Sequence, residues 1–222
     1  TRHHYDNCQE YKRILDTVGF DTKRKNKFED IPFLPVRLFK EYDLMSVDRA
    51  SIVKTLTSSG TTGQQVSKIF LDKEAVTFQT KTLTHIMSDF LGKNRVPMII
   101  IDSSAVLKNR SMFSARGAGI IGFSIFGKDR IYALDENMEL DIEGMIQFLE
   151  KHEGEIIFLF GFTFMIWQHF YKELIRIGYR PDLSKGILVH GGGWKKLISE
   201  SVSNERFKDC LNDVCGIKHV HD

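Results

Sequence analysis

Short apolar runs rich in isoleucine and valine recur along the chain and alternate with longer amphipathic stretches. The runs have the length of β-strands and lack a polar face, which is typical of strands buried on both sides of a parallel sheet. The predicted strands cover residues 68–71, 96–102, 130–134, 155–160, 187–190 and 218–221.

Helical periodicity fills the intervals between these strands. Asp72 can cap a helix whose apolar residues repeat at intervals of three and four as far as Leu91, and Gly92 follows as a stop signal. Asp141 caps a second helix, which runs out at Gly154. The predicted helices cover residues 6–18, 72–91, 141–152, 163–177 and 194–214. This alternation predicts an α/β fold with a largely parallel β-sheet flanked by helices.

The composition limits the class of protein and its partners but does not indicate a function. Of the 222 residues, 42% are hydrophobic and 27% are charged, as expected of a globular protein with a core. A formal net charge of +2 gives no reason to expect nucleic acid as a partner. No apolar run approaches the ~18 residues of a membrane span. The three cysteines, Cys8, Cys210 and Cys215, cannot all pair, which favours a reduced, cytoplasmic setting. No linker or repeat divides residues 1–222, which are predicted to form one region.

One loop has an unusual composition. The stretch LTSSGTTGQQ, residues 56–65, gathers five hydroxyl side chains around Gly60 and Gly63, between two β-like stretches at residues 52–57 and 67–71. Backbone N–H groups and hydroxyls in such a turn can form an anion nest, and glycine lets an oxygen come close to the backbone. We therefore favour a phosphate site over a hairpin that merely happens to be rich in Ser and Thr. It is not a Walker A loop, because Gly63 is followed by glutamines and then by a strand.

Residues 58–63, SSGTTG, resemble the phosphate-loop motif of the adenylate-forming superfamily, whose members activate a carboxylate with ATP and pass the acyl group to a thiol. Residues 30–40, DIPFLPVRLFK, and 189–197, VHGGGWKKL, resemble one family within it, the acyl-protein synthetases of bacterial bioluminescence operons. These enzymes are also called long-chain-fatty-acid–luciferin-component ligases and are related to the phenylacetate–CoA ligases. The likeness extends from about Phe28 to Asp222.

The resemblance implies a role for each matching segment, with ATP and Mg²⁺ as the cofactors. The phosphates of ATP would be held by Thr57, Ser58, Ser59, Gly60, Thr61, Thr62 and Gly63. The adenine would rest on His190, Gly191, Gly192, Gly193 and Trp194. The acyl group would be lined by Phe160, Gly161, Phe162 and the start of the following helix at Thr163, with Arg116 and Gly117 nearby. The implied partners are a fatty acid and an acyl reductase or another protein acyl acceptor, and no metal held by side chains is implied.

The chain departs from the family at its end. The family's Tyr-Gly-x-Thr/Val-Glu motif, which binds AMP and magnesium, is expected just after Asp222, where the sequence stops. The adenylation lysine and the acyl-accepting cysteine would also lie further on. Residues 1–222 are thus expected to be the N-terminal portion of the large domain, with its catalytic residues beyond Asp222 and no activity of its own.

Two other functions fit part of the pattern. An acyl- or aryl-CoA ligase of the phenylacetate type would use free CoA instead of a protein thiol as the acceptor. A non-catalytic nucleotide-binding module would keep the glycine-rich loops and release no pyrophosphate.

Weaker signals compete with these interpretations. Residues 117–122, GAGIIG, have a dinucleotide-binding spacing, but no buried strand precedes them, so tight helix packing explains them better. His219 and His221 share one face of a predicted strand and would need a third ligand to bind zinc. Cys215 would be an acyl acceptor only if the family's downstream cysteine were absent. The aromatic run at residues 158–171 suits either a core or a site for a long acyl chain.

Overall fold

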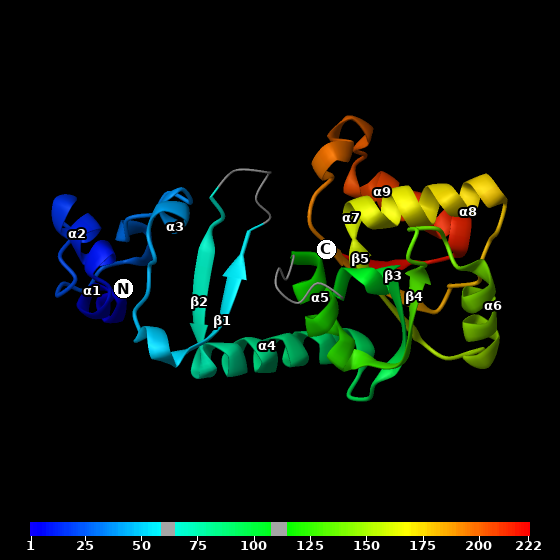
Figure 1. Ribbon diagram of the computed structural model, residues 1–222, viewed down its shortest axis with the longest axis horizontal. Helices are drawn as coiled ribbons and strands as arrows, with labels where there is room; N and C mark the ends of the chain where they lie inside the picture. Colours follow the sequence, from blue (N-terminus) through cyan, green and yellow to red (C-terminus); the bar gives the residue numbers. More distant parts are fainter. Residues whose placement is uncertain (59–64, 108–114) are drawn as a thin grey trace. The chain divides into compact units, whose positions relative to one another are not determined.

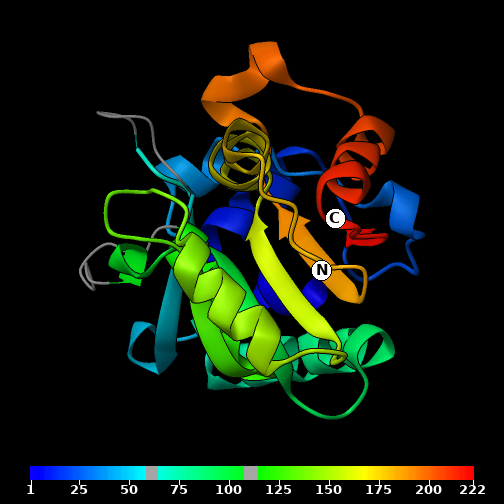
Figure 2. The same ribbon diagram turned by 90° about the vertical axis from the view of Figure 1, so that its right-hand side faces the viewer.

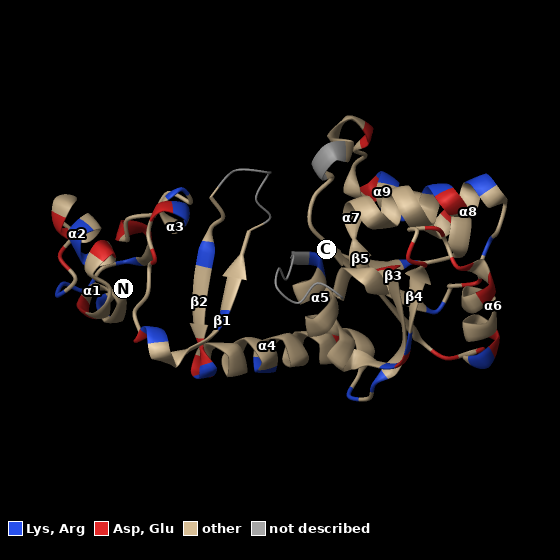
Figure 3. Cartoon of the chain, viewed as in Figure 1, with Lys and Arg blue, Asp and Glu red and all other residues tan. Residues whose placement is uncertain are grey.

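The computed structural model describes residues 1–58, 65–107 and 115–222. It divides into two compact units, Thr1–Leu83 and Thr84–Asp222 (Figure 1). Basic and acidic residues are interspersed along both units, in keeping with the small net charge (Figure 3). No helix in the described part of the chain is long and apolar enough to cross a membrane.

The first unit contains an antiparallel hairpin, in which Thr57 of β1 pairs with Lys68 of β2. The single helix predicted over residues 6–18 is wrong, because the backbone is extended at Cys8 and divides it in two. Cys8 is only 4% exposed, so the break turns its side chain into the small core of this unit. The elements are α1 (Arg2–Asn7), α2 (Gln9–Thr17), η1 (Phe28–Asp30), α3 (Leu38–Glu41), η2 (Arg49–Ser51), β1 (Ile52–Thr57) and β2 (Lys68–Asp72).

Helix α4 (Lys73–Leu91) follows the hairpin and has the ends that the sequence predicts. The Asp72 carboxylate accepts a hydrogen bond from the N–H of Ala75 at 2.8 Å, which satisfies one of the free donors of the first turn. Gly92 ends the helix in the left-handed conformation, at φ +76°.

The second unit contains a five-stranded parallel sheet, which confirms the predicted α/β fold. Its strands are β3 (Val96–Ser103), β4 (Gly127–Leu134), β5 (Ile157–Phe162), β6 (Gly186–Gly191) and β7 (His219–His221), in the order β4-β3-β5-β6-β7. The chain first adds β4 on one side of β3 and then crosses to β5 on the other side. The order therefore reverses between β3 and β5.

Helices lie on both sides of this sheet (Figures 1 and 2). One face carries α5 (Ala115–Phe123), and its inward residues include Met98, Ile100, Phe158 and Phe160. The other face carries the larger apolar core, including Ile99, Ile101, Leu159 and Leu188. The helices packed on that core are α6 (Ile142–Lys151), the π-helical segment η5 (Ile166–Tyr171), α8 (Lys172–Ile177) and α9 (Asn204–Cys215), and the short α7 (Thr163–Met165) leads from β5 into η5. Two short 3₁₀ turns, η3 (Ser104–Leu107) and η4 (Ser124–Phe126), flank α5.

The predicted helix over residues 194–214 is divided into η6 (Lys195–Glu200) and α9. Ser201 is extended, and the Ser203 hydroxyl accepts a hydrogen bond from the N–H of Arg206 at 3.2 Å. Serine side chains compete with helical hydrogen bonds and favour cap positions, which explains why one helix ends and another begins here.

Candidate active site

The strand order locates the candidate site. In open α/β sheets, ligands bind beyond the carboxyl ends of the strands where the order reverses, which here is between β3 and β5. Asp102 lies at this end of β3, Phe162 ends β5, and His190 and Gly191 end β6. Phe162 and Gly191 are register partners on adjacent parallel strands. The predicted acyl segment and the predicted adenine loop therefore meet at one edge of the sheet.

Thr163 ties these two segments together. Its hydroxyl donates to the carbonyl oxygen of Gly192 at 2.8 Å and lies 3.3 Å from that of Gly191. The same oxygen is 3.0 Å from Nδ1 of His190. Thr163 is 6% exposed, so these hydrogen bonds are shielded from water. The sequence places Thr163 in the acyl segment but gives no signal of this bridge, because its partners follow 27–29 residues later.

His190 is a buried, neutral part of this bridge. It is 7% exposed, and its ring packs against Phe207 at a centroid distance of 4.9 Å. Because the Thr163 hydroxyl gives its one proton to Gly192, Nδ1 of His190 must be the donor to Thr163. Nε2 then carries a lone pair, and it has no hydrogen-bond partner among the described residues. Burial lowers the pKa of His190, which keeps the ring uncharged.

Replacing His190 with asparagine is expected to make the second unit less sensitive to mild acid. The folded pKa of His190 lies below its ordinary value of 6.5, so protonation favours the unfolded chain. Above pH 6.5, His190 thus adds no pH dependence to the free energy of unfolding. As the pH decreases from 6.5 through the lowered pKa, the free energy of unfolding falls by about 1.4 kcal/mol per pH unit at most. Asparagine can still donate to Thr163 but does not titrate.

The measurement is urea unfolding at about pH 7.5 and about pH 5.5, followed by tryptophan fluorescence. The wild-type chain should lose more stability between the two pH values than the His190→Asn variant. Equal losses in the two proteins would contradict the assignment of a buried, neutral His190.

The glycine loop at the end of β6, residues 191–193, has one packed position and two open ones. Gly192 adopts φ +74°, and a Cβ there would lie 2.8 Å from the ring of Phe162. A Cβ at Gly191 or Gly193 would meet no heavy atom within 4 Å. The Trp194 side chain is half-buried and packs edge-to-face on Trp167 at 5.3 Å. Open backbone beside an aromatic side chain fits the flat face of a purine base, so these residues suit the predicted adenine site.

The first two residues of the acyl segment, Phe160 and Gly161, are buried in the core. Phe160 is 3% exposed and stacks on Phe123 of α5 at a centroid distance of 4.3 Å. A Cβ at Gly161 would come within 3.0 Å of Ile101. Phe162, at the end of the strand, is half-buried. Of this segment, Phe162 therefore has the side chain best placed to contact a ligand.

Of the glycines in GAGIIG, Gly119 serves helix packing, whereas a Cβ at Gly122 would meet no heavy atom within 4 Å. They lie within α5, where Gly117 is buried in the first turn. A Cβ at Gly119 would lie 3.1 Å from the Phe160 ring and 3.3 Å from the Phe162 ring. The absence of a side chain at Gly119 lets α5 approach β5 closely.

Arg116 is held at this edge by a buried carboxylate. Its guanidinium donates two hydrogen bonds to Asp102, at 2.9 Å and 2.7 Å. Asp102 is 1% exposed and also accepts from the N–H of Ser103 at 2.7 Å. The Arg116 side chain is 24% exposed, so its charged head group is held in a fixed position and is still partly accessible. Sequence reasoning found Arg116 but missed Asp102, whose signal is a charged residue at the end of an apolar run.

The phosphate loop is described only at its base, in the first unit. Thr57 is the exposed last residue of β1. The Ser58 hydroxyl accepts from the N–H of Ser67 at 2.9 Å, and the N–H of Ser58 donates to the Ser67 carbonyl at 3.1 Å. These bonds close the hairpin. The predictions for Ser59, Gly60, Thr61, Thr62 and Gly63 lie outside the described residues.

The structure does not support the two alternative roles, Cys215 as an acyl acceptor and His219 with His221 as zinc ligands. Cys215 is 2% exposed, and burial raises its pKa to about 12, so its thiol is neither accessible nor ionised for an acyl transfer. In the part of the chain that the structure describes, no three His, Cys, Asp or Glu side chains are grouped closely enough to hold a metal. A zinc site at His219 and His221 thus lacks a third ligand among those residues.

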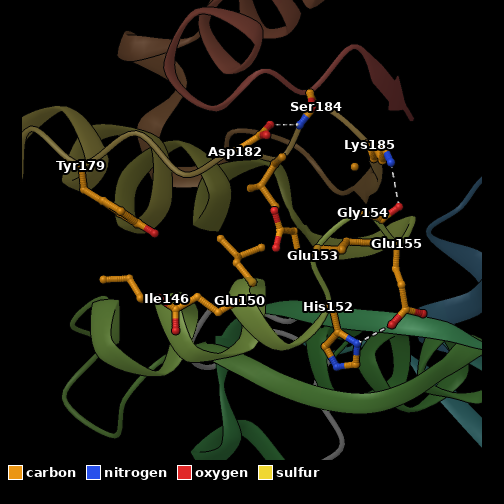
Figure 4. Close-up of a pocket in the computed structure, with 14 residues that line it drawn as sticks. Ile146, Glu150, His152, Glu153, Gly154, Glu155, Tyr179, Asp182, Ser184 and Lys185 are labelled. Carbon is orange, nitrogen blue, oxygen red and sulfur yellow. Dashed lines mark hydrogen bonds and ion pairs between the residues drawn. The ribbon is translucent and has the colours of Figure 1, made fainter.

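A separate cavity of about 720 Å³ lies at the opposite, amino edge of the sheet (Figure 4). Its lining is acidic, with Glu150, Glu153 and Asp182. The buried His152 ring, which also lines it, is held between the carboxylates of Asp129 and Glu155, at 2.8 Å each. None of the predicted site residues lines this cavity, and its charge does not suit ATP or a fatty acid.

The comparisons with known proteins agree on one family. A family model described as "Acyl-protein synthetase, LuxE" matches residues 1–222. A protein from Photorhabdus luminescens named long-chain-fatty-acid–luciferin-component ligase is 37% identical over 62 residues, which cover 28% of this chain and 53% of that protein. A protein of the same name from Vibrio harveyi is 21% identical over 217 residues, which cover 95% of this chain and 55% of that protein. The chain spans about half the length of these curated relatives.

Proposed function

The chain belongs to the LuxE acyl-protein synthetase family, and from this premise we propose that it takes part in ATP-dependent activation of a long-chain fatty acid and transfer of the acyl group to a protein cysteine. The names of the two relatives support a ligase that acts on long-chain fatty acids. The substrates, the cytoplasmic setting and an acyl reductase as acceptor are parts of the same proposal.

One observation carries this proposal: the ends of β5 and β6 are joined by Thr163 and by the contact between Gly192 and Phe162. An acyl chain beside Phe162 and an adenine on the glycine loop would then be neighbours. Carboxylate activation by ATP requires that proximity, because the reacting carboxylate must approach the α-phosphate.

The reaction proceeds in two steps. A carboxylate oxygen of the fatty acid attacks the α-phosphorus of ATP, the bond to the β-phosphate oxygen breaks, and pyrophosphate leaves. A cysteine thiolate of the acceptor then attacks the acyl carbon, and AMP leaves with the bonding electron pair. The carboxylate is already the nucleophile, so no side chain of this chain has to act as a base in the first step.

The residues of this chain would act by positioning and electrostatics. The hydroxyls and backbone of residues 57–63 would bind the β- and γ-phosphates. The cation held by Asp102, Arg116, would face the carboxylate or the phosphates from a fixed direction. When bound, Mg²⁺ supplies charge neutralisation on the phosphates, and its ligands would be mainly phosphate oxygens and water.

The proposed reaction is tested by pyrophosphate exchange. The protein that contains these residues should incorporate labelled pyrophosphate into ATP only when a long-chain fatty acid is present. Exchange that does not depend on the fatty acid, or none at all, would contradict acid activation. Supplying free CoA or a protein thiol then separates a CoA ligase from an acyl-protein synthetase.

Nucleotide binding by the chain is expected to change the emission of Trp194. Trp194 adjoins the open glycines, and Trp167 packs against it at 5.3 Å, so the signal can come from either ring. Titration with Mg-ATP should alter the fluorescence of the wild-type chain and of Trp167→Phe, but much less that of Trp194→Phe. If ATP leaves the emission of both tryptophans unchanged, the adenine assignment is wrong.

A further inference from the structure

A second cavity, of about 540 Å³, lies on the α5 side of the sheet, beside the edge strand β4. Arg95 and Arg130 line it together with Tyr132, and none of its lining residues is a carboxylate. None of the predicted acyl residues, Phe160, Gly161, Phe162, Arg116 and Gly117, lines it either. It is therefore distinct from the candidate active site.

The two arginines are cations with few acceptors. Arg95 is exposed and has no hydrogen bond or ion pair with the described residues. Arg130 donates a long hydrogen bond, 3.4 Å, to the Ser124 carbonyl. Burial raises the pKa of Tyr132, so the phenol also stays a donor at neutral pH. Charged donors with so few acceptors favour an anionic ligand.

Part of the lining of this cavity is apolar. Ile121 at the end of α5 is 45% exposed, Ile125 in η4 is 40% exposed, and both line the cavity. Ile100 of β3, a core residue that is only 1% exposed, also contributes to the lining. An alkyl chain along these isoleucines would remove apolar surface from water, which is favourable.

We propose that this cavity binds a monomeric alkyl carboxylate, with the carboxylate at Arg95 and Arg130 and the alkyl chain along Ile121 and Ile125. The site goes beyond the proposed activation reaction, because it lies outside the acyl segment and needs no ATP. It would hold a fatty acid apart from the reacting one.

The test is titration of the chain with dodecanoate, kept monomeric and without ATP, in a calorimeter. Losing both charged donors in Arg95→Gln/Arg130→Gln should weaken binding at this cavity at least about tenfold. The control is Arg13→Gln, which removes an exposed arginine in the first unit and should bind like the wild type. Hydrogen exchange should show that dodecanoate protects residues 119–132 in the wild type and in the control but not in the double variant.

Three results would overturn the proposal. The first is equal affinity and equal protection of residues 119–132 in the wild type and the double variant. The second is binding of methyl dodecanoate, which lacks the charge, as tightly as dodecanoate. The third is binding of phosphatidylglycerol vesicles with no binding of monomeric dodecanoate, which would indicate a lipid surface instead. Because the exchange readout covers this cavity and uses no ATP, it does not depend on whether the activation reaction takes place.

Discussion

Replacing Arg116 with methionine is expected to lower the free energy of unfolding of the second unit by about 3–5 kcal/mol. Asp102 is 1% exposed, and its two carboxylate oxygens receive the paired hydrogen bonds of the guanidinium. Methionine fills much of the same volume but leaves this carboxylate buried without a counter-charge. An unpaired buried charge costs far more than the pair contributes, and that difference sets the size of the effect.

The matched control is the double variant Asp102→Asn/Arg116→Met, which removes both charges and should recover most of the lost stability. Both tryptophans of the chain, Trp167 and Trp194, lie in the second unit, so their fluorescence follows the unfolding of that unit. If Arg116→Met unfolds at the same urea concentration as the wild type, Asp102 does not depend on this partner.

Replacing Gly193 with valine is expected to weaken ATP binding by roughly tenfold to a hundredfold and to leave the free energy of unfolding unchanged. The loss of affinity corresponds to an overpacking cost of about 1–3 kcal/mol in the complex with ATP. A Cβ at Gly193 meets no protein atom within 4 Å, so the free protein accommodates the side chain. The same open space is where the adenine would lie. The measurements are calorimetric titration with Mg-ATP and thermal unfolding of each variant.

Gly192 supplies the contrasting control. Its φ of +74° disfavours any side chain, and a Cβ would lie 2.8 Å from Phe162. Gly192→Ala should therefore lower stability as well as ATP affinity. If Gly193→Val binds ATP as tightly as the wild type, the base does not lie on this loop.

The sequence predicts most of the sheet because four of its five strands, β3 to β6, contain apolar runs, whereas β7 is His-Val-His. The six predicted strands all exist, within a few residues of their predicted ends, but the one at residues 68–71 is β2 of the antiparallel hairpin and not a strand of the parallel sheet. The helices that fail are those in which a local competitor acts against the periodicity. Cys8 interrupts the first predicted helix, and Ser201 and Ser203 interrupt the last one.

The candidate site is predictable where a motif is contiguous and not where it depends on tertiary contacts. The glycine loop at residues 191–193 and the acyl segment are short contiguous motifs that can be recognised in the sequence. The bridge made by Thr163 does not, because its partners come from the next strand. Asp102 is missed for the same reason, since Arg116 follows it 14 residues later with no periodic relation.

The Thr163 bridge has a thermodynamic consequence. A ligand that shifts the loop at Gly192 must also shift Phe162, because the two are in contact and Thr163 joins their strands. Nucleotide and fatty acid would then bind with a coupling free energy, and linkage makes that coupling reciprocal. Whatever factor a bound fatty acid applies to the dissociation constant of ATP, ATP applies to that of the fatty acid. Thr163→Val, which keeps the shape but removes the hydroxyl, should bring this factor closer to one.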